Sequence, residues 1–324
     1  MPESEKERSP SKFALGLHAP GRWDKILNIN ECHLQTEISN KILQSIKELS
    51  SGIEPYNIRE HTGFLRHVMI RVAANTNEIM VNIVTSRDEP QTLDTMLDTL
   101  ITRFPNITSI VNNITTRKAG VSMGEHQIVL HGNEYMLEKL GDYEFMISAD
   151  SFFQTNTRQA EKLYNIVLEE SELTGNEIVY DLFCGTGSIS LFLSKHAKMV
   201  YGFELVMSAV QDAMQNAIHN KVKNAWFFRG NLENIFRENI EAKGLELPDV
   251  LVVDPPRSGL HVKTIEDIIE KSPKRIVYVS CNPASQARDV ALLCNEKYEL
   301  KKLRPVDMFP HTPHVENVAT LILK

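Results

Sequence analysis

The sequence lacks a long apolar run, a cysteine cluster and an excess of positive charge. No apolar stretch in its 324 residues approaches the ~18 residues that span a bilayer, and the polar start, MPESEKERSPSK, has no apolar core of a signal peptide. We therefore expect a cytoplasmic protein with no membrane partner, and nothing in the sequence indicates an obligatory protein partner. The formal net charge of −7 argues against a protein that simply coats nucleic acid.

Cysteine is scarce as well. The four cysteines are widely separated and form no CxxC pair, so the usual spacing of a zinc site or a redox couple is missing. In a reducing compartment we expect free thiols unless a cofactor binds them. They are Cys32, Cys184, Cys281 and Cys294.

The hydrophobic pattern divides the chain into three parts, in keeping with room for about two domains. Residues 1–50 indicate a loose polar tail and a linker helix between Leu34 and Leu49. Residues 51–150 predict a smaller α+β domain, mostly antiparallel, with one helix that Pro105 ends. The strands expected there are HVMIRVA, EIMVNIV, TSIVNNI, QIVLHG and EYMLEKL.

Residues 151–324 have a different rhythm. After a helix capped near Thr155 or Asn156, near-continuous apolar strands alternate with helices, which is typical of a parallel sheet covered on both faces. The expected strands are EIVYDL, MVYGFE, AWFFRG, DVLVVD and RIVYVS, followed by an antiparallel pair, YELKKLRPVDMF and NVATLILK. The prediction is a Rossmann-like α/β domain with a mostly parallel sheet of seven strands.

The first turn of this domain, DLFCGTGS, is a candidate cofactor site. Gly185 and Gly187 let the backbone pass close to a ligand, and Glu204, 23 residues after Asp181, suits both hydroxyls of a ribose. A dinucleotide fingerprint would have a third glycine where Ser190 stands, so S-adenosylmethionine, which has no phosphate, fits better. The alternative is an ordinary turn with an ordinary acid. Asn231, after the next strand, is placed to reach the adenine.

Two further strand ends carry candidate chemistry. Asp254 opens DPPRSGL, where a following tyrosine would have suggested methylation of an exocyclic amine but Arg257 stands instead. Cys281 follows the next strand in SCNP, beside the same crevice if ligands bind at the carboxyl ends of the strands. A buried cysteine that acts only as a small apolar residue is the alternative.

The segment HTPHVE supplies the last candidates. His311 and His314 belong to a loop or form a pair of metal ligands, although no other His or Cys cluster completes a metal site. Glu316, at the start of the last expected strand, is better interpreted as a base delivered to the crevice.

In this order and spacing, FFQTN, DLFCGTGS, DPPRSGL, SCNP and HTPHVE resemble the RNA uracil-5-methyltransferases, which make 5-methyluridine in ribosomal or transfer RNA. The resemblance extends from about Gly16 to Lys324 and implies S-adenosylmethionine as cofactor and RNA as partner. It implies that Cys281 adds to C6 of uracil and that Glu316 removes the C5 proton. It also implies that the target base is flipped out of folded RNA.

The resemblance implies further site residues. Asp254 and Gln154 would hold the uracil edge and the cofactor, and Phe152 or Phe153 would stack on the extruded base. Residues at positions that line the cofactor pocket in relatives are Phe183, Ser188, Glu204 and Asn231. Many relatives have Asn at the position of Ser188.

Residues 51–150 would bind RNA in this family. Two basic clusters there are candidates, although a solvated sheet face is an equal interpretation of both. The first contains Arg59, Arg66, His67 and Arg71, and the second contains Arg117 and Lys118.

One departure from the family concerns metal. Many relatives have an upstream OB-like domain and three cysteines that, with a fourth, hold a [4Fe–4S] cluster, whereas only Cys32, in NECHLQ, has a counterpart here. One thiolate cannot hold such a cluster, so we expect no iron–sulfur centre and treat Cys32 as a possible remnant ligand. The chain is then a fragment of a longer protein or a shortened form.

The function predicted from the sequence is methylation of uracil C5, with 23S rRNA as the favoured substrate. The alternatives are a tRNA uracil-5-methyltransferase, a truncated RNA-binding protein without catalysis, and an amino-group methyltransferase that uses the DPPR loop.

Overall fold

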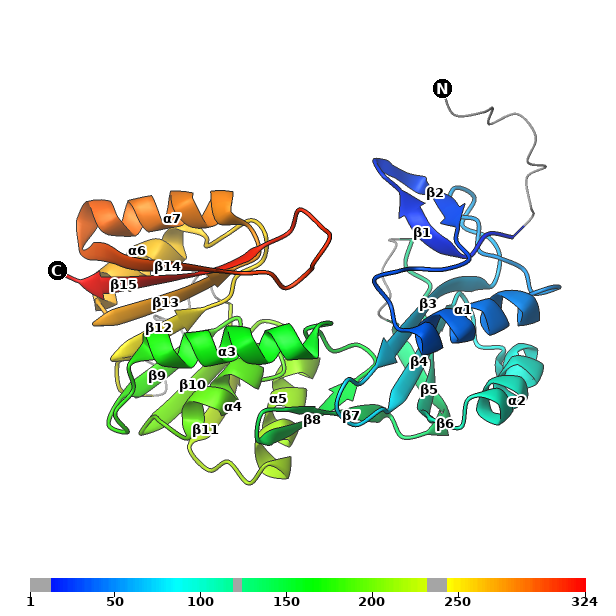
Figure 1. Ribbon diagram of the computed structural model, residues 1–324, viewed down its shortest axis with the longest axis horizontal. Coiled ribbons are helices and arrows are strands. Elements are labelled where there is room, and N and C mark those ends of the chain that lie inside the picture. Colours follow the sequence, from blue (N-terminus) through cyan, green and yellow to red (C-terminus); the bar gives the residue numbers. More distant parts are fainter. Residues whose placement is uncertain (1–12, 119–123, 232–243) are drawn as a thin grey trace. The chain divides into compact units, whose positions relative to one another are not determined.

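The computed structural model describes residues 13–118, 124–231 and 244–324, which fold as two compact units (Figure 1). The first unit is formed by the described part of residues 1–73 and by Asn77–Met136, and the second by Ala74–Thr76 and Leu137–Lys324. The predicted tail, residues 1–12, lies outside the described residues. The assignment of residues 51–150 to RNA binding and of residues 151–324 to catalysis stays a prediction.

The first unit contains a four-stranded sheet in the order β3-β4-β5-β6, with β4 and β5 parallel and the outer pairs antiparallel. The strands are β3 (Leu65–Val72), β4 (Ile79–Thr85), β5 (Ile107–Ile114) and β6 (His126–Gly132). The 3-10 helix η1 (Pro90–Leu93) and α2 (Asp94–Arg103) connect the parallel pair, and α1 (Glu37–Leu49) packs beside them. A separate hairpin of β1 (Gly16–Ala19) and β2 (Arg22–Asn28), which the sequence pattern did not predict, precedes α1.

The core of this unit follows from the pattern of the two helices. Ile42 and Ile46 lie one turn apart on α1, and Met96 and Leu100 lie one turn apart on α2, so each helix presents one apolar stripe. Both stripes pack in one buried cluster with β4, which is buried along its whole length. No helix in the described part of the chain is long and apolar enough to cross a membrane.

The second unit contains the predicted seven-stranded sheet, in the order β11-β10-β9-β12-β13-β15-β14. The first five of these are mutually parallel, and β15 is antiparallel to both of its neighbours. The strands are β9 (Ile178–Leu182), β10 (Met199–Glu204), β11 (Ala225–Arg229), β12 (Val250–Val253), β13 (Arg275–Ser280), β14 (Tyr298–Val306) and β15 (Glu316–Leu323). A hairpin of β7 (Tyr135–Leu140) and β8 (Tyr143–Ser148) stands before them in sequence, and β8 was not predicted.

Helices cover both faces of this sheet (Figure 1). Alternate residues of β9 point to opposite faces: Tyr180 and Leu182 share a buried cluster with α6 and α7, whereas Asp181 meets Ser190 of α4 on the other side. The helices are α3 (Thr157–Ser171), α4 (Ser188–Ser194), α5 (Met207–His219), α6 (Val262–Lys271) and α7 (Pro283–Glu296). The predicted cap of α3 is Asn156, whose side chain accepts a hydrogen bond from the backbone N–H of Gln159.

The strand order sets the place of a site. β9 has β10 on one side and β12 on the other, so the chain crosses in opposite directions from this strand. Ligands of open α/β sheets bind outside the carboxyl ends of the strands at such a switch point.

Candidate active site

Five predicted residues gather at the carboxyl edge of the sheet. Phe183, Asp254 and Cys281 each directly follow a parallel strand (β9, β12 and β13), and Glu204 is the last residue of β10. Glu316 reaches the same edge from the opposite direction. It is the first residue of antiparallel β15, whose next residue, Asn317, pairs with Ser280, so Glu316 and Cys281 each lie one residue beyond the last pair of the two strands.

The glycine turn after β9 is tight on one side and open on the other. A side chain on Gly187, which has φ +80°, would place its Cβ 2.8 Å from Cζ of Phe227. A Cβ on Gly185 would meet no described atom within 4 Å, so the turn leaves space there. Phe183 has a φ of +67°, a conformation that non-glycine residues seldom adopt outside functional or strained positions.

Glu204 joins the two turns that the sequence pattern linked. One carboxylate oxygen accepts a hydrogen bond from the backbone N–H of Gly185 at 3.3 Å, and the other accepts from the N–H of Val206 at 2.9 Å. Glu204 and the glycine turn are therefore in contact, and both lie at the carboxyl ends of β9 and β10, where the strand order reverses.

Asp181 is a residue to which the sequence analysis gave no role. It is fully buried, one oxygen accepts a hydrogen bond of 2.6 Å from the Ser190 hydroxyl, and the other has no hydrogen-bond partner among the described residues. Burial raises the pKa of Asp181 to about 7, with a smaller contribution from Glu204. An orphaned buried carboxylate oxygen beside an open glycine turn fits a ligand that brings a donor or a positive charge. The signal in the sequence was an acid near the end of an otherwise apolar strand.

Burial and neighbouring charges shift the pKa values of Asp254, Glu316 and Cys281 at this edge. Burial, Glu316 and Asp181 raise the pKa of Asp254 to about 8. Burial also raises the pKa of Glu316, and the cation of Arg257 opposes that shift. Burial, Glu316 and Asp254 raise the pKa of the Cys281 thiol, whereas Arg257 lowers it. The thiol, the two carboxyls and the guanidinium therefore lie within electrostatic reach of one another.

Arg257 had no predicted role. The sequence signal was its place after Asp254-Pro255-Pro256, where an aromatic residue would suit a flat amine substrate. The opposing effects on Cys281 and Glu316 make it the positive group of this cluster.

The remaining cysteines have different surroundings. Cys184 is buried, and burial raises the pKa of its thiol well above the usual value. Cys294 lies near the end of α7, and Cys32 belongs to the first unit, where its backbone exchanges two hydrogen bonds with Asn40. Cys281 is the half-buried thiol that stands among the carboxyls.

The side chains of the described residues do not form a donor set for a metal cluster. The described residues contain no group of three or more His, Cys, Asp or Glu side chains that could hold a metal ion. His311 and His314 are exposed in the β14–β15 connection, and Cys32 offers a single thiol. We therefore assign no chemistry to a metal.

The FFQTN segment separates two residues that the sequence left as alternatives. The ring of Phe153 packs 5.5 Å from that of Phe145, centroid to centroid, whereas Phe152 is 71% exposed. Gln154, the next residue in the sequence, is half-buried. Asn156 donates a hydrogen bond of 3.1 Å to the backbone oxygen of Met308, which ties this segment to the connection that leads to Glu316.

Ser188 and Asn231 complete the predicted set. The Ser188 hydroxyl lies 3.0 Å from that of the buried Tyr164, so the smaller side chain at this position has a partner of its own. Asn231 is exposed and follows Gly230, whose N–H donates to the backbone oxygen of Glu204 at 3.0 Å.

The basic clusters of the first unit are largely engaged in local contacts. Arg59 forms an ion pair with Asp24, Arg117 with Glu125, and the Arg66 guanidinium lies 4.1 Å from the centre of the Tyr56 ring. These contacts favour the solvated-face interpretation for those side chains and leave Lys118 exposed.

The strand order and the turn chemistry define the fold of S-adenosylmethionine-dependent methyltransferases. A profile of the family described as tRNA (Uracil-5-)-methyltransferase matches residues 120–324. The chain belongs to this family of RNA methyltransferases, which confirms the predicted family and fold class.

Known proteins agree with this assignment. The chain is 42% identical over 320 residues to an uncharacterized RNA methyltransferase of Chlorobaculum tepidum, covering 98% of this chain and 66% of that protein. It is 44% identical to one of Porphyromonas gingivalis, with 96% and 68% covered. The chain thus spans about two thirds of the length of these relatives.

A solved structure is also similar. The tRNA (uracil-54, C5)-methyltransferase of Pyrococcus abyssi, in complex with S-adenosyl-L-homocysteine, superposes with a TM-score of 0.75 at 34% identity, over 93% of this chain and 71% of that one. S-adenosyl-L-homocysteine is what remains of the predicted cofactor after it loses its methyl group, so the cofactor prediction agrees with this neighbour.

Proposed function

We propose that this chain methylates C5 of a uridine in RNA, with Cys281 as the nucleophile and Glu316 as the base. The observation that carries the proposal is the pairing of β13 with β15, which brings the thiol and the carboxyl to one edge of the sheet, beside Asp254. A nucleophile and a base that act on adjacent ring carbons need this kind of proximity.

Cys281 makes the unreactive carbon reactive. C5 of uracil is a weak nucleophile, but addition of the Cys281 thiolate to C6 moves electron density to C5 as an enolate. The raised pKa of this thiol means that the free site holds mostly the neutral form at neutral pH, so a positive group or a proton acceptor is needed to produce the thiolate. Arg257 supplies the positive charge.

Glu316 completes the reaction. Once C5 carries the methyl group it still carries a proton, which Glu316 takes, so that the thiolate leaves C6 and the aromatic ring is restored. A raised pKa makes Glu316 a stronger base than an exposed glutamate. Asp254, whose pKa is about 8, keeps a proton at neutral pH in the free site and can donate it in a hydrogen bond to a uracil carbonyl oxygen.

The cofactor would lie over the glycine turn. When bound, S-adenosylmethionine supplies a methyl group on a positively charged sulfur. Glu204 would hold the ribose hydroxyls. The other residues proposed to line this pocket are Gln154, Phe183, Ser188, Asn231 and Asp254.

The RNA must present an unstacked base. The exposed ring of Phe152 suits stacking on a flipped uracil, because it is free of the packing that holds Phe153. We propose 23S rRNA as the substrate. A tRNA is the second candidate, because the similar Pyrococcus abyssi enzyme is a tRNA (uracil-54, C5)-methyltransferase.

RNA that contains 5-fluorouridine tests the mechanism, because fluorine at C5 cannot leave as a proton. In the presence of S-adenosylmethionine, the protein should form a covalent complex with the label on the Cys281 peptide. Cys281→Ala should form none, and equal trapping of Cys281→Ala would overturn the proposal. Full activity of Cys281→Ser on unmodified RNA would instead indicate methylation of an amino group.

A second experiment identifies the RNA. Tritiated methyl groups from the cofactor are located after incubation with total RNA from a strain that lacks 5-methyluridine. Label in 23S rRNA supports the first substrate and label in tRNA the second. Cofactor binding without label in any RNA would support a non-catalytic RNA-binding protein.

A further inference from the structure

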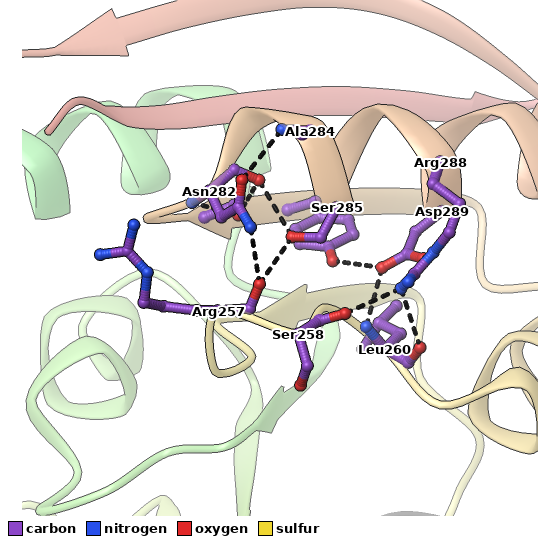
Figure 2. Close-up of polar contacts among 10 residues, drawn as sticks. Arg257, Ser258, Leu260, Asn282, Ala284, Ser285, Arg288 and Asp289 are labelled. Atoms are coloured by element: carbon purple, nitrogen blue, oxygen red, sulfur yellow. Dashed lines mark hydrogen bonds and ion pairs between the residues drawn. The ribbon is translucent and has the colours of Figure 1, made fainter. Parts of the chain in front are cut away.

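Side chains of helix α7 and of its cap residue Asn282 hold the second half of the DPPRSGL loop, from Arg257 to Leu260. The loop follows β12 and carries Asp254 and Arg257, and three of its backbone oxygens accept hydrogen bonds from side chains at the start of α7 (Figure 2). Cys281 directly precedes Asn282, the cap residue of α7, so the loop and the thiol are both attached to the start of this helix.

The far end of the loop is fastened by a buried carboxylate. One oxygen of Asp289 accepts hydrogen bonds of 2.7 Å from both the Leu260 N–H and the Tyr278 hydroxyl, and the other accepts from Arg288 at 2.8 Å. Gly259, with φ +82°, passes so close that a Cβ there would collide with this carboxylate. The loop therefore has little freedom to slide along the helix.

The near end is fastened at Arg257 itself. Its backbone oxygen accepts a hydrogen bond of 2.8 Å from the side-chain amide of Asn282 and lies 3.1 Å from the Ser285 hydroxyl (Figure 2). The Ser285 hydroxyl also lies 3.0 Å from the backbone oxygen of Asn282, and its single proton serves only one of the two oxygens at a time. Asn282 is thus the steadier donor.

The hydrogen bonds to the Arg257 backbone oxygen fix the position of the backbone from which the charged Arg257 side chain extends. The Arg257 guanidinium projects beyond the hydrogen-bonded backbone in Figure 2, and no ion pair joins it to a described residue. The groups that act on the Cys281 thiol are Glu316 of β15 and Asp254 of the β12 loop, which raise its pKa together with burial, and Arg257, which lowers it. The N-terminus of α7 adds a favourable partial charge on the same side.

We propose that Asn282 and Ser285 are positioning residues that hold the Arg257 cation beside Cys281 and so set how much thiolate the free enzyme contains. The proposal rests on the proposed function, because it assigns a purpose to the thiolate of Cys281. It adds that Asn282, the residue after Cys281, must connect the nucleophile to the DPPRSGL loop through its hydrogen bond to Arg257.

A purely structural role for Asn282 is the competing explanation, because its side-chain oxygen also caps α7 by accepting from the Ala284 N–H at 3.2 Å. Asn282→Ser separates the two roles. Serine is a good helix cap but is too short to reach the Arg257 oxygen, and it adds no charge. Ser285→Ala removes the second donor and leaves the cap untouched.

The test measures the thiol directly, without RNA or cofactor. Iodoacetamide alkylates the thiolate form, so the alkylation rate of the Cys281 peptide, followed by mass spectrometry across pH, gives the pKa of this thiol. Arg257→Gln provides the reference for complete loss of the cation. Asn224→Ser is the matched control, since Asn224 donates to two backbone oxygens, at 2.8 and 3.0 Å, near the start of β11.

The Asn282→Ser/Ser285→Ala double variant should move the alkylation midpoint upward by about half a pH unit to one unit, in the direction of Arg257→Gln, because a nearby opposite charge shifts a pKa by ~1 unit or more. Alkylation near neutral pH should fall about 3- to 10-fold, in step with that shift. Asn224→Ser should leave the midpoint unchanged.

Three results would overturn the proposal, two from the reference and double variants and one from Ser285→Ala. One is a double variant with the wild-type midpoint while Arg257→Gln is shifted, and another is an Arg257→Gln variant that is not shifted. Ser285→Ala alone, which spares the cap, should shift in the same direction but less, and a downward shift would also count against the proposal. Failure of the wild type to trap 5-fluorouridine RNA would instead refute the proposed function and leave the alkylation result standing.

Discussion

Replacement of Asp254 by asparagine should stabilise the protein, and the gain should grow with pH. In the folded chain the pKa of Asp254 is about 8, compared with the ordinary 3.8, chiefly because of burial. Between these two values the folded protein keeps a proton that the unfolded chain has lost. Stability therefore falls as pH rises through this window, and it is greatest below the unfolded pKa.

The size of the effect follows from the two pKa values. Each pH unit inside the window removes up to ~1.4 kcal/mol, so the upper limit over the whole window is ~5 to 6 kcal/mol. Asp254 is half-buried rather than fully enclosed, and Glu316 shares the repulsion. We therefore expect Asp254→Asn to gain ~2 to 3 kcal/mol at about pH 8.5 and almost nothing near pH 4.

Urea unfolding across pH measures the effect. The protein has two tryptophans, one in each unit, so a Trp23→Phe background leaves Trp226 of β11 to report on the second unit alone. The free energy of unfolding is then compared between Asp254→Asn and its parent at about five pH values from 4.5 to 8.5. A difference that does not change with pH would refute the reasoning.

Asp249 offers a matched control with the opposite sign. It precedes the same strand, β12, at the other end, and Lys274 at 2.9 Å holds its pKa below the usual value. Its contribution is present above the unfolded pKa and is lost as pH falls through the folded value. Asp249→Asn should therefore destabilise the protein at neutral pH, with a loss that disappears in acid.

Three further predictions concern the site and its scaffold. Glu316→Gln should still form the covalent link to RNA but release the methylated product at least ~100-fold more slowly, because the C5 proton has no base to accept it. With unmodified RNA as substrate, the covalent protein–RNA adduct should then accumulate and be visible in denaturing gels. Rapid turnover would contradict the role of Glu316 as base. Gly187→Ala should lower the free energy of unfolding in urea by ~2 kcal/mol or more, because it combines a positive φ with a Cβ 2.8 Å from Phe227. An unchanged urea midpoint would contradict this packing argument. Phe152→Ala should lower kcat/KM for RNA by ~10-fold and leave the stability of the protein unchanged. Phe153→Ala should instead destabilise the protein by ~3 kcal/mol, because its ring packs against Phe145. The reverse pattern would make Phe153 the stacking residue and Phe152 the structural one.

Much of the fold was accessible from the sequence because the strands of the second unit are short apolar runs separated by helices. The missed elements had weaker signals. The β1–β2 hairpin leaves most of its residues exposed, so it lacks the alternation of a strand packed on a core. β8 follows β7 after the two residues Gly141-Asp142, a hairpin signal that the sequence does contain.

The pairing in the first unit was predicted only in part. A mostly antiparallel sheet was expected, and two of its three pairings are antiparallel, but β4 and β5 run parallel. The helical segment between them, η1 and α2, is long enough for a crossover connection, and parallel neighbours need such a connection.

The sequence predicted which strand ends carry the candidate site residues, but it did not predict how the charges at the site affect one another. Cys281 and Glu316 could be placed at one edge because topology and register dictate it. The pattern could not decide between Phe152 and Phe153, since both are aromatic and adjacent, and only packing against Phe145 separates them. No role was predicted for Arg257, because its effect on the pKa values of Cys281 and Glu316 depends on proximity in the folded chain rather than on its neighbours in sequence.

The position of β15 has a consequence for how the protein is made. In the sheet, β15 lies between β13 and β14, although the ribosome produces both of those strands first. β14 pairs only with β15 among the described strands, so during synthesis it emerges with both edges open. The strand that fills this gap begins with Glu316, so the proposed base emerges from the ribosome together with the strand that joins β13 to β14. Until β15 has left the ribosomal tunnel, the facing edges of β13 and β14 have no partner strand and are open to pairing with other chains.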